Sequence, residues 1–436
     1  LRHRGYNVKF VRNFTDIDDK IIKRANEMGV SWNNVSERFT DEFYTDMDKL
    51  GVLRADIEPK ATEHIDEMIH IIQTLITKGY AYTVKEGEGE SVYFEVSKFK
   101  DYGKLSKKTL DELMAGARVD INERKKSPMD FALWKASKEG EPWWQSPWGK
   151  GRPGWHIECT AMSIKHIGET LDIHGGGADL IFPHHENEIA QSEAFTGKEF
   201  AKYWIHNGFI TIDKEKMSKS LGNFFTIREI LQKYDAEIVR CFLLSSHYRS
   251  PLEFSEEQLK ESESLLDRFY TSLERIDDYL KYGAGKKKRE RNEVVNIKEE
   301  MEETLGNFYN AMDDDFNTAL ALGVVFDFLR TVNRYIDSLP ALEEAVSVLT
   351  RAKDLIAIFS GVLNIFNKTP KQWQLALLGT KGITISIDEI TKKIEERNTA
   401  RKQKDYKRAD EIRDELEKTG IILEDKKEGT VWKVAR

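Results

Sequence analysis

Three residues of types that bind transition metals lie near the middle of the 436-residue sequence: Cys159, His184 and Glu188. A thiolate, an imidazole and a carboxylate are ordinary zinc ligands, and three protein ligands with an open fourth position are typical of a reactive zinc. If the stretch around His184 is helical, the four-residue spacing places His184 and Glu188 on one face. Such a pair is also common as a plain surface pair, so spacing alone leaves both interpretations open. His185 and Glu186 are rival ligands, which a helix would point elsewhere, where they would orient the metal ligands.

A second candidate site is the pentapeptide Lys216-Met217-Ser218-Lys219-Ser220. Two lysines that flank small residues in a loop can hold a polyphosphate and neutralise the charge on departing pyrophosphate. A lysine-rich chain contains such a pentapeptide by chance as well. Its place between an α/β segment and a helical segment favours the phosphate interpretation, with Lys216 and Lys219 as the catalytic residues.

Three consecutive glycines, Gly175, Gly176 and Gly177, come just before Asp179. Glycines allow a backbone to approach a ligand closely, and an aspartate just beyond them can bind a ribose hydroxyl. The run could equally be a tight turn. The P-loop pattern G-x-x-x-x-G-K-[ST] does not occur in the sequence, so a P-loop nucleotide site is not supported.

The bulk composition limits the class of protein. The length predicts two to four domains, and 40% hydrophobic with 33% charged residues is typical of a globular chain. No run is long and apolar enough to span a bilayer, which predicts no membrane partner. The two cysteines, Cys159 and Cys241, exclude a disulfide framework and predict a cytoplasmic protein. The net charge of −8 does not suggest nucleic acid, although basic clusters at 286–289 and 397–413 could give local positive surface or be plain solvated faces.

The elements that must position these residues follow from the periodicity of apolar side chains. The pattern predicts strands at 8–12, 81–84 and 91–96 and helices at 21–47 and 65–76, then irregular structure up to Gly151. Helix, strand and loop alternate from Gly154 to Asn223. From Ser255 the pattern is almost wholly helical, and it ends in a charged helical hairpin at 387–420 and a small β-hairpin.

Five strings, together with the pentapeptide at Lys216, resemble one family. The pentapeptide matches the KMSKS signature of class I aminoacyl-tRNA synthetases. The others resemble cysteinyl-tRNA synthetases of the bacterial type, and they are Asn13-Phe14-Thr15-Asp16-Ile17-Asp18-Asp19-Lys20, Gly154-Trp155-His156-Ile157-Glu158-Cys159, Asp172-Ile173-His174-Gly175-Gly176-Gly177, Phe182-Pro183-His184-His185-Glu186-Asn187-Glu188 and Asp313-Asp314-Asp315-Phe316-Asn317-Thr318.

The resemblance implies an α/β plus all-α fold, in which a Rossmann-like catalytic domain is split by an insertion and followed by a helical bundle and a small anticodon-binding module. The implied parts are the first half of the catalytic domain (1–48), the insertion (49–150), the second half (151–215), the KMSKS loop and stem-contact region (216–254), the bundle that holds the tRNA arm (255–366) and the anticodon module (385–436).

The same resemblance implies that Cys159, His184 and Glu188 bind one zinc ion per chain. The family's fourth zinc ligand is a second cysteine, and the resemblance places that cysteine and the HIGH motif upstream of Leu1. We therefore expect the sequence to be incomplete at its N-terminus.

The resemblance also assigns substrates and the residues that contact them. The implied partners are ATP with Mg²⁺, L-cysteine and tRNA-Cys, for a protein that is expected to be a monomer. Cysteine would contact Thr15, Tyr44 and Trp155. The residues implied for ATP are Gly175, Gly176, Gly177, Asp179, His206, Lys216 and Lys219, and those implied for the anticodon are Arg401, Tyr406 and Asp410.

Two alternatives remain open from the sequence. One is the related ligase of mycothiol synthesis, which joins cysteine to an amino sugar; residues 385–436 argue against it because that ligase should lack a tRNA-binding tail. The other is a non-catalytic tRNA-binding paralogue.

Overall fold

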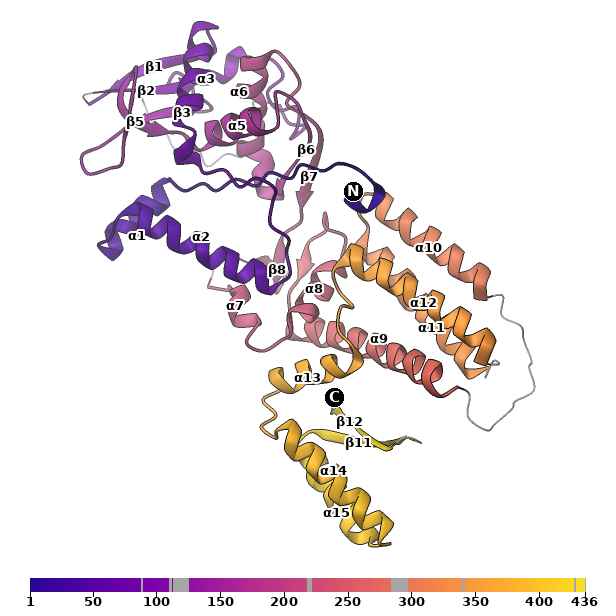
Figure 1. Ribbon diagram of the computed structural model, residues 1–436. Coiled ribbons are helices and arrows are strands. Elements are labelled where there is room, and N and C mark those ends of the chain that lie inside the picture. The colour runs from indigo at the N-terminus through magenta and orange to yellow at the C-terminus, as the bar shows by residue number, and fades with distance from the viewer. Residues whose placement is uncertain are drawn as a thin grey trace. The chain divides into compact units, whose positions relative to one another are not determined.

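The computed structural model describes residues 1–87, 89–109, 112, 125–217, 222–283, 297–338, 342–426 and 429–435 (Figure 1). The chain forms two compact units, Leu1–Phe209 and Ile210–Arg436. Each unit has apolar clusters of its own, so each is described by itself. Among the described residues, no helix is both long and apolar enough to cross a membrane.

The first unit begins with helices α1 (Asp19–Met28), α2 (Trp32–Lys49) and α3 (Ile65–Thr77). Helix α1 starts where the Asp18 carboxylate accepts a hydrogen bond of 2.7 Å from the backbone N–H of Ile21. The stretch 8–12 does not form the regular strand that the sequence predicts; it makes a parallel bridge between Val11 and Ile57 and backbone hydrogen bonds that join Phe10 and Arg12 to residues 56–57. Alternation in sequence does not by itself provide a neighbouring strand with which to pair.

Helix α3 confirms the periodicity of the sequence. Its residues Met68, Ile72 and Leu75 recur at helical spacing, and all three are fully buried. They belong to the apolar cluster that also contains Phe94 and Leu133 of the neighbouring sheet. The buried face of the helix therefore covers that sheet.

An antiparallel five-stranded sheet follows, in the order β1-β2-β3-β5-β4. Its strands are β1 (Ala81–Glu86), β2 (Gly89–Phe94), β3 (Phe131–Ala136), β4 (Trp144–Ser146) and β5 (Gly149–Pro153). The two strands predicted from the sequence, β1 and β2, are confirmed. The expectation of irregular structure up to Gly151 is wrong, because β3, β4 and β5 lie in that stretch. Glycines and Pro153 disfavour a strand locally, and β5 forms because β3 and β4 pair with it on both sides.

Helix α5 (Trp155–His166) starts directly from this sheet (Figure 1). The N–H of Gly154 donates to the carbonyl of Leu133 at 2.9 Å. A side chain at Gly154 would place its Cβ 1.9 Å from the carbonyl oxygen of Ala132, so only glycine fits there. This close approach fixes the start of α5, which carries Trp155 and Cys159, against β3.

A parallel β-α-β arrangement completes the first unit. It consists of β6 (Leu171–Gly177), α6 (Glu186–Thr196) and β7 (Ala201–Asn207). Helix α6 packs beside α5, and the two helices join the same apolar cluster. The α/β alternation predicted from Gly154 onward is therefore confirmed.

The second unit opens with a small three-stranded sheet in the order β10-β8-β9. Its strands are β8 (Ile210–Ile212), β9 (Glu215–Lys216) and β10 (Leu252–Glu253), and the helices α7 (Ile227–Ile230) and α8 (Ala236–Leu244) lie between β9 and β10 in the chain. Strand β10 runs parallel to β8, and β9 runs antiparallel to it.

The rest of the second unit is mainly helical, as the sequence predicts (Figure 1). The bundle contains α9 (Glu256–Tyr282), α10 (Ile297–Asp313), α11 (Thr318–Asp337), α12 (Leu342–Leu363) and α13 (Pro370–Thr380). The predicted helical hairpin and β-hairpin are confirmed as α14 (Ile387–Lys402), α15 (Tyr406–Lys418), β11 (Ile421–Lys426) and β12 (Gly429–Val434). The longest helix, α9, starts where the Ser255 hydroxyl accepts a hydrogen bond from the N–H of Gln258.

Candidate metal and nucleotide site

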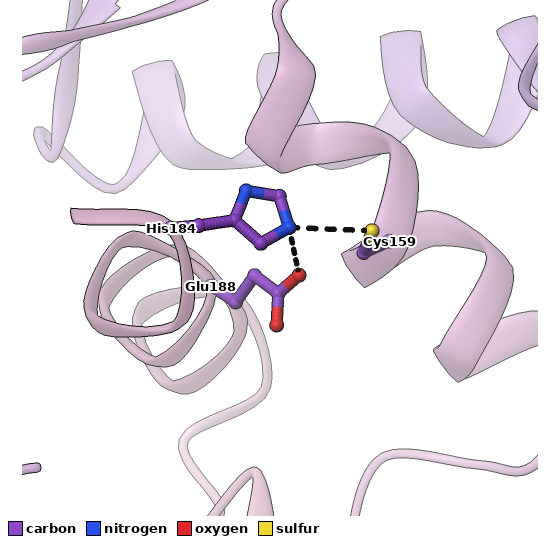
Figure 2. A group of neighbouring side chains, drawn as sticks. All are labelled: Cys159, His184 and Glu188. Carbon is purple, nitrogen blue, oxygen red and sulfur yellow. Dashed lines mark hydrogen bonds and ion pairs between the residues drawn. The ribbon is translucent and has the colours of Figure 1, made fainter. Parts of the chain in front are cut away.

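The three predicted metal ligands lie together in the first unit (Figure 2). Cys159 projects from α5, Glu188 from α6, and His184 from the turn that leads into α6. One imidazole nitrogen, Nε2 of His184, lies 3.6 Å from the Cys159 sulfur and 2.8 Å from a Glu188 oxygen. His184 and Glu188 are buried, and Cys159 is partly buried.

The donor set fits a zinc ion. The three ligand atoms all lie within 4.8 Å of one another. Zinc bonds place the atoms at neighbouring tetrahedral corners about 3.3–3.8 Å apart, and the separation of 3.6 Å between Cys159 and His184 falls in this range. The separation of 2.8 Å between His184 and Glu188 is that of a direct hydrogen bond, so a zinc ion would move these two side chains slightly apart. Sulfur, nitrogen and one carboxylate oxygen are also the donor types that zinc prefers.

The electrostatics of the group favour a bound cation. Burial by itself raises the pKa of Glu188, but the imidazoles of His174 and His184 outweigh it and hold this pKa well below its usual value. Burial, together with the Glu188 charge, raises the pKa of the Cys159 thiol well above its usual value. The pocket thus holds a carboxylate beside a thiol that needs a nearby cation to lose its proton.

Further histidines surround this group. His174 and His185 form a second possible donor set with Glu188. Nδ1 of His156 lies 2.8 Å from Nδ1 of His184, on the ring edge that does not face Cys159. Burial lowers the pKa of His185 to about 3, so this imidazole is neutral at physiological pH.

The expectation that His185 and Glu186 point away is confirmed only for Glu186. The Glu186 carboxylate accepts hydrogen bonds from the backbone N–H groups of Leu105 and Ser106, at 3.1 and 2.9 Å. His185 lies near Glu188, because side chains three residues apart are also neighbours on a helix.

Two of the three predicted cysteine-binding residues contact His184 or the residue that precedes Cys159. The Trp155 ring stacks on the His184 imidazole with centroids 4.1 Å apart, and it is 46% exposed, so it offers an open aromatic face. The Thr15 hydroxyl hydrogen-bonds the buried carboxyl group of Glu158, which precedes Cys159 on α5. Because burial outweighs that bond, the pKa of Glu158 lies well above its usual value.

Tyr44 has a different environment. Its hydroxyl donates to Glu58 at 2.6 Å, and the Arg54 guanidinium lies 3.5 Å from its ring centroid. Among the described residues, Tyr44 also contacts the rings of Phe14 and Phe43, and these partners do not include Cys159, His184 or Glu188.

The glycine run is the end of strand β6, so the tight-turn interpretation is wrong. A Cβ at Gly176 would lie 3.0 Å from the His185 ring, and a Cβ at Gly177 would lie 2.6 Å from a carboxylate oxygen of Asp179. Gly176 pairs with His206 on the parallel strand β7, and Nε2 of His206 lies 2.9 Å from Nδ1 of His185. The residues predicted to bind ATP in this unit therefore adjoin the metal-ligand group.

The signature lysines belong to the second unit. Lys216 ends strand β9, where it is exposed, and the N–H of the next residue, Met217, donates to Ile210 on β8 at 2.9 Å. Lys219 lies outside the described residues.

The predicted anticodon residues lie near the tip of the α14–α15 hairpin. Tyr406 is 62% exposed, and Asp410 is also exposed. Arg401 forms an ion pair of 2.7 Å with Asp425 on β11. The basic cluster at 397–413 is partly paired within the module, since Arg397 also binds Asp425; the cluster at 286–289 lies outside the described residues.

Besides His156, sequence reasoning missed two further partners of the metal-ligand group. Nε2 of His174 lies 2.8 Å from Oε2 of Glu188, and the Asn13 amide nitrogen lies 3.6 Å from the Cys159 sulfur. Both residues occur in strings that resemble the family, and this resemblance is the sequence signal that could have identified them.

Three family models match the chain. The model of the class I (C) tRNA synthetase catalytic domain matches residues 1–264, the DALR domain matches 307–367, and the cysteinyl-tRNA ligase anticodon binding domain matches 389–432. A cysteine–tRNA ligase of Thermodesulfovibrio yellowstonii is 62% identical over 434 residues, which cover 100% of this chain and 89% of that protein. The corresponding protein of Geobacter metallireducens is 55% identical, with coverage of 100% and 89%.

A solved structure agrees in fold. Mycobacterium tuberculosis methionyl-tRNA synthetase in complex with methionyl-adenylate superposes with a TM-score of 0.61 at 16% identity, over 87% of this chain and 85% of that chain. The predicted class I synthetase fold, α/β followed by helices, is thereby confirmed. The extent and identity of these matches show that the chain belongs to the cysteine–tRNA ligase family of class I aminoacyl-tRNA synthetases.

Proposed function

We propose that the chain activates L-cysteine with ATP and transfers it to the 3′ end of tRNA-Cys, with a zinc ion at Cys159, His184 and Glu188 that selects the substrate thiol. The observation that carries the zinc assignment is the convergence of sulfur, nitrogen and oxygen donors within 4.8 Å of one another. The match to the anticodon binding domain at 389–432 supports tRNA as the acceptor over the amino-sugar alternative.

Selection of cysteine over serine requires a large difference in binding free energy, roughly 5–7 kcal/mol for a selectivity of 10⁴–10⁵. Bound zinc would supply that difference, because it lowers the pKa of a thiol and binds sulfur more tightly than a hydroxyl. The Trp155 face would exclude water beside the thiol, and Thr15 would orient the amino group. Tyr44 would lie farther from the substrate thiol than Trp155, since it contacts Arg54, Glu58 and neighbouring rings.

In the first reaction step the cysteine carboxylate attacks the α-phosphorus of ATP, forming cysteinyl-adenylate and releasing pyrophosphate. Gly175, Gly176 and Gly177 would let ATP lie close to strand β6, with Asp179 towards the ribose and His206 near the adenine. Lys216 and Lys219, with Mg²⁺, would neutralise the charge that builds on the leaving phosphates. The terminal ribose hydroxyl of the tRNA then attacks the adenylate carbonyl and releases AMP.

Recognition of the tRNA would be divided along the chain. We assign 1–48 and 151–215 to the catalytic domain, 49–150 to its insertion, 216–254 to the KMSKS loop and stem-contact region, 255–366 to the bundle that holds the tRNA arm and 385–436 to the anticodon module. Arg401, Tyr406 and Asp410 would contact the anticodon. The protein would act as a monomer, and the thiol of Cys159 suits the reducing cytoplasm.

Cysteine-dependent ATP–pyrophosphate exchange tests the proposal directly. The protein should be assayed with zinc present. We expect exchange with cysteine and none above background with serine. Absence of exchange with cysteine, in protein that is folded and contains zinc, would contradict the proposed function.

A further inference from the structure

The acidic turn between α10 and α11 has no role in the chemistry described so far. Asp315 and Phe316 both have left-handed backbone conformations in this turn, with φ of 52° and 56°. Aspartate and asparagine tolerate this conformation better than most residues, and phenylalanine does not. The turn is therefore held in place by contacts that outweigh a local strain.

Those contacts attach the turn to the end of α8. The Asp315 carboxylate accepts hydrogen bonds from the Tyr248 hydroxyl at 2.7 Å and from the Arg249 guanidinium at 2.5 and 3.1 Å. The Thr318 hydroxyl donates to the carbonyl of Leu244 at 2.9 Å. The turn is thus hydrogen-bonded to both ends of the segment 244–249.

The contacts around Asp315 are those of an ionised carboxylate. Its bonds to Arg249 and Tyr248 hold the pKa of Asp315 below its usual value. Burial, with the neighbouring carboxylate, raises the pKa of the Tyr248 hydroxyl to about 12, so the hydroxyl keeps the proton that it donates. His247 Nε2 lies 3.9 Å from the same carboxylate.

The segment that is bonded to Asp315 continues directly into strand β10, which belongs to the same small sheet as Lys216. After a tight turn, in which the N–H of Ser250 donates to His247, the chain forms β10. Strand β10 pairs with β8, and the Glu253 carboxylate on β10 accepts a hydrogen bond of 2.5 Å from the Thr211 hydroxyl on β8. Strand β8 in turn pairs with β9, where Thr211 lies opposite Lys216.

We propose that Asp315 is a positioning residue for Lys216, acting through Arg249 and Tyr248, strand β10 and strand β8. The turn that matches the family signature would thereby keep Lys216 in register with the helical bundle. This inference rests on the proposed function, because it takes Lys216 as a residue that stabilises the leaving phosphates.

Asp315→Asn tests the inference with little change to the backbone, because asparagine also tolerates a left-handed conformation. The matched control is Asp314→Asn, since the Asp314 side chain is exposed in the same turn. We expect Asp315→Asn to lower kcat of cysteine-dependent pyrophosphate exchange on the order of tenfold to a hundredfold. The KM for cysteine and the unfolding temperature should stay at wild-type values, and the control should behave as wild type.

Limited trypsin digestion gives a second measurement that does not depend on activity. If the attachment at Asp315 holds strand β9 in place, Asp315→Asn should be cleaved after Lys216 several-fold faster than wild type, and Asp314→Asn should not. Arg249→Met should reproduce both effects, and the double variant with Asp315→Asn should be no worse than either single variant.

The outcomes separate this inference from the proposed function. Wild-type kcat and wild-type cleavage in Asp315→Asn would overturn the positioning role while leaving the synthetase assignment intact. A loss of kcat that accompanies an equal rise in the KM for cysteine and a lowered unfolding temperature would also overturn it, in favour of a general structural role. If the wild type shows no exchange with cysteine, the proposed function fails, and faster cleavage would still support the attachment.

Discussion

Nε2 of His174 lies 2.8 Å from Oε2 of Glu188, and it contacts the carboxylate oxygen that does not face His184. The two oxygens of one buried carboxylate thus have separate partners. Histidine–carboxylate pairs of this kind fix the orientation of a metal ligand. The position of Glu188 therefore depends on a residue of β6 as well as on its own helix.

Replacing His174 by glutamine should weaken zinc binding without abolishing it. Loss of an orienting partner typically costs about tenfold to a hundredfold in metal affinity. Competition with a chromophoric chelator would measure the dissociation constant. His70→Gln, on the separate helix α3, is a suitable control. Unchanged zinc affinity in His174→Gln would show that His174 does not fix the orientation of Glu188.

Cys159→Ala should remove the metal itself. We expect the zinc content to fall from about one per chain to near zero and cysteine-dependent exchange to fall by more than about a hundredfold, because a direct ligand matters more than an orienting partner. Elemental analysis after gel filtration measures the first quantity. The only other cysteine, Cys241, is buried in the second unit, so Cys241→Ala is the matched control. Full zinc content in Cys159→Ala would exclude Cys159 as a ligand.

The site was only partly predictable from sequence, for a physical reason. The spacing of His184 and Glu188 lies within about one helical turn, so local geometry suffices to bring them together. Cys159 and His174 reach the same point from other elements, through packing that no local pattern encodes. The expectation for His185 was wrong because His185 and Glu188 are three residues apart, a spacing that also brings two side chains together on a helix.

The same distinction applies to the fold. Helices such as α3 have a recurring apolar face, and the sequence predicts them because that face depends on neighbouring residues only. Strands β3, β4 and β5 were missed because their stability comes from pairing with each other, and β5 contains glycines and Pro153. The stretch around Val11 is the reverse case, in which alternation is present but the pairing with residues 56–57 is too short to form a regular strand.

Asp425 should make the stability of the C-terminal module sensitive to acid. Its bond to Arg397, with further bonds to Thr430 and Arg401, holds the pKa of Asp425 well below its usual value despite partial burial. A carboxylate whose pKa is lowered by folding stabilises the folded state above its unfolded pKa of about 3.9, and this contribution disappears as the pH falls towards the folded pKa. The difference in free energy of unfolding between wild type and Asp425→Asn should therefore be constant from neutrality to about pH 5 and become smaller below about pH 4.

Urea unfolding of wild type and Asp425→Asn at several pH values would measure this difference. Asp414→Asn is the matched control, because Asp414 is an exposed carboxylate on α15. If the difference in free energy of unfolding between wild type and Asp425→Asn stays constant down to pH 2, the ion pair with Arg397 is not the source of that difference.

Tyr406 should contribute to tRNA recognition and not to cysteine activation. Its ring is 62% exposed at the start of α15, which suits stacking on an unpaired base. Such a stack contributes about 1–3 kcal/mol, so Tyr406→Ala should lower kcat/KM for tRNA about 5-fold to 150-fold. Pyrophosphate exchange should be unchanged, and Tyr406→Phe should retain most of the activity because the aromatic face remains. Tyr282→Ala, at the exposed end of α9, controls for the loss of a surface tyrosine. Equal kcat/KM for tRNA in Tyr406→Ala and wild type would remove Tyr406 from the anticodon contacts, whereas equal losses in both alanine variants would indicate a general surface effect.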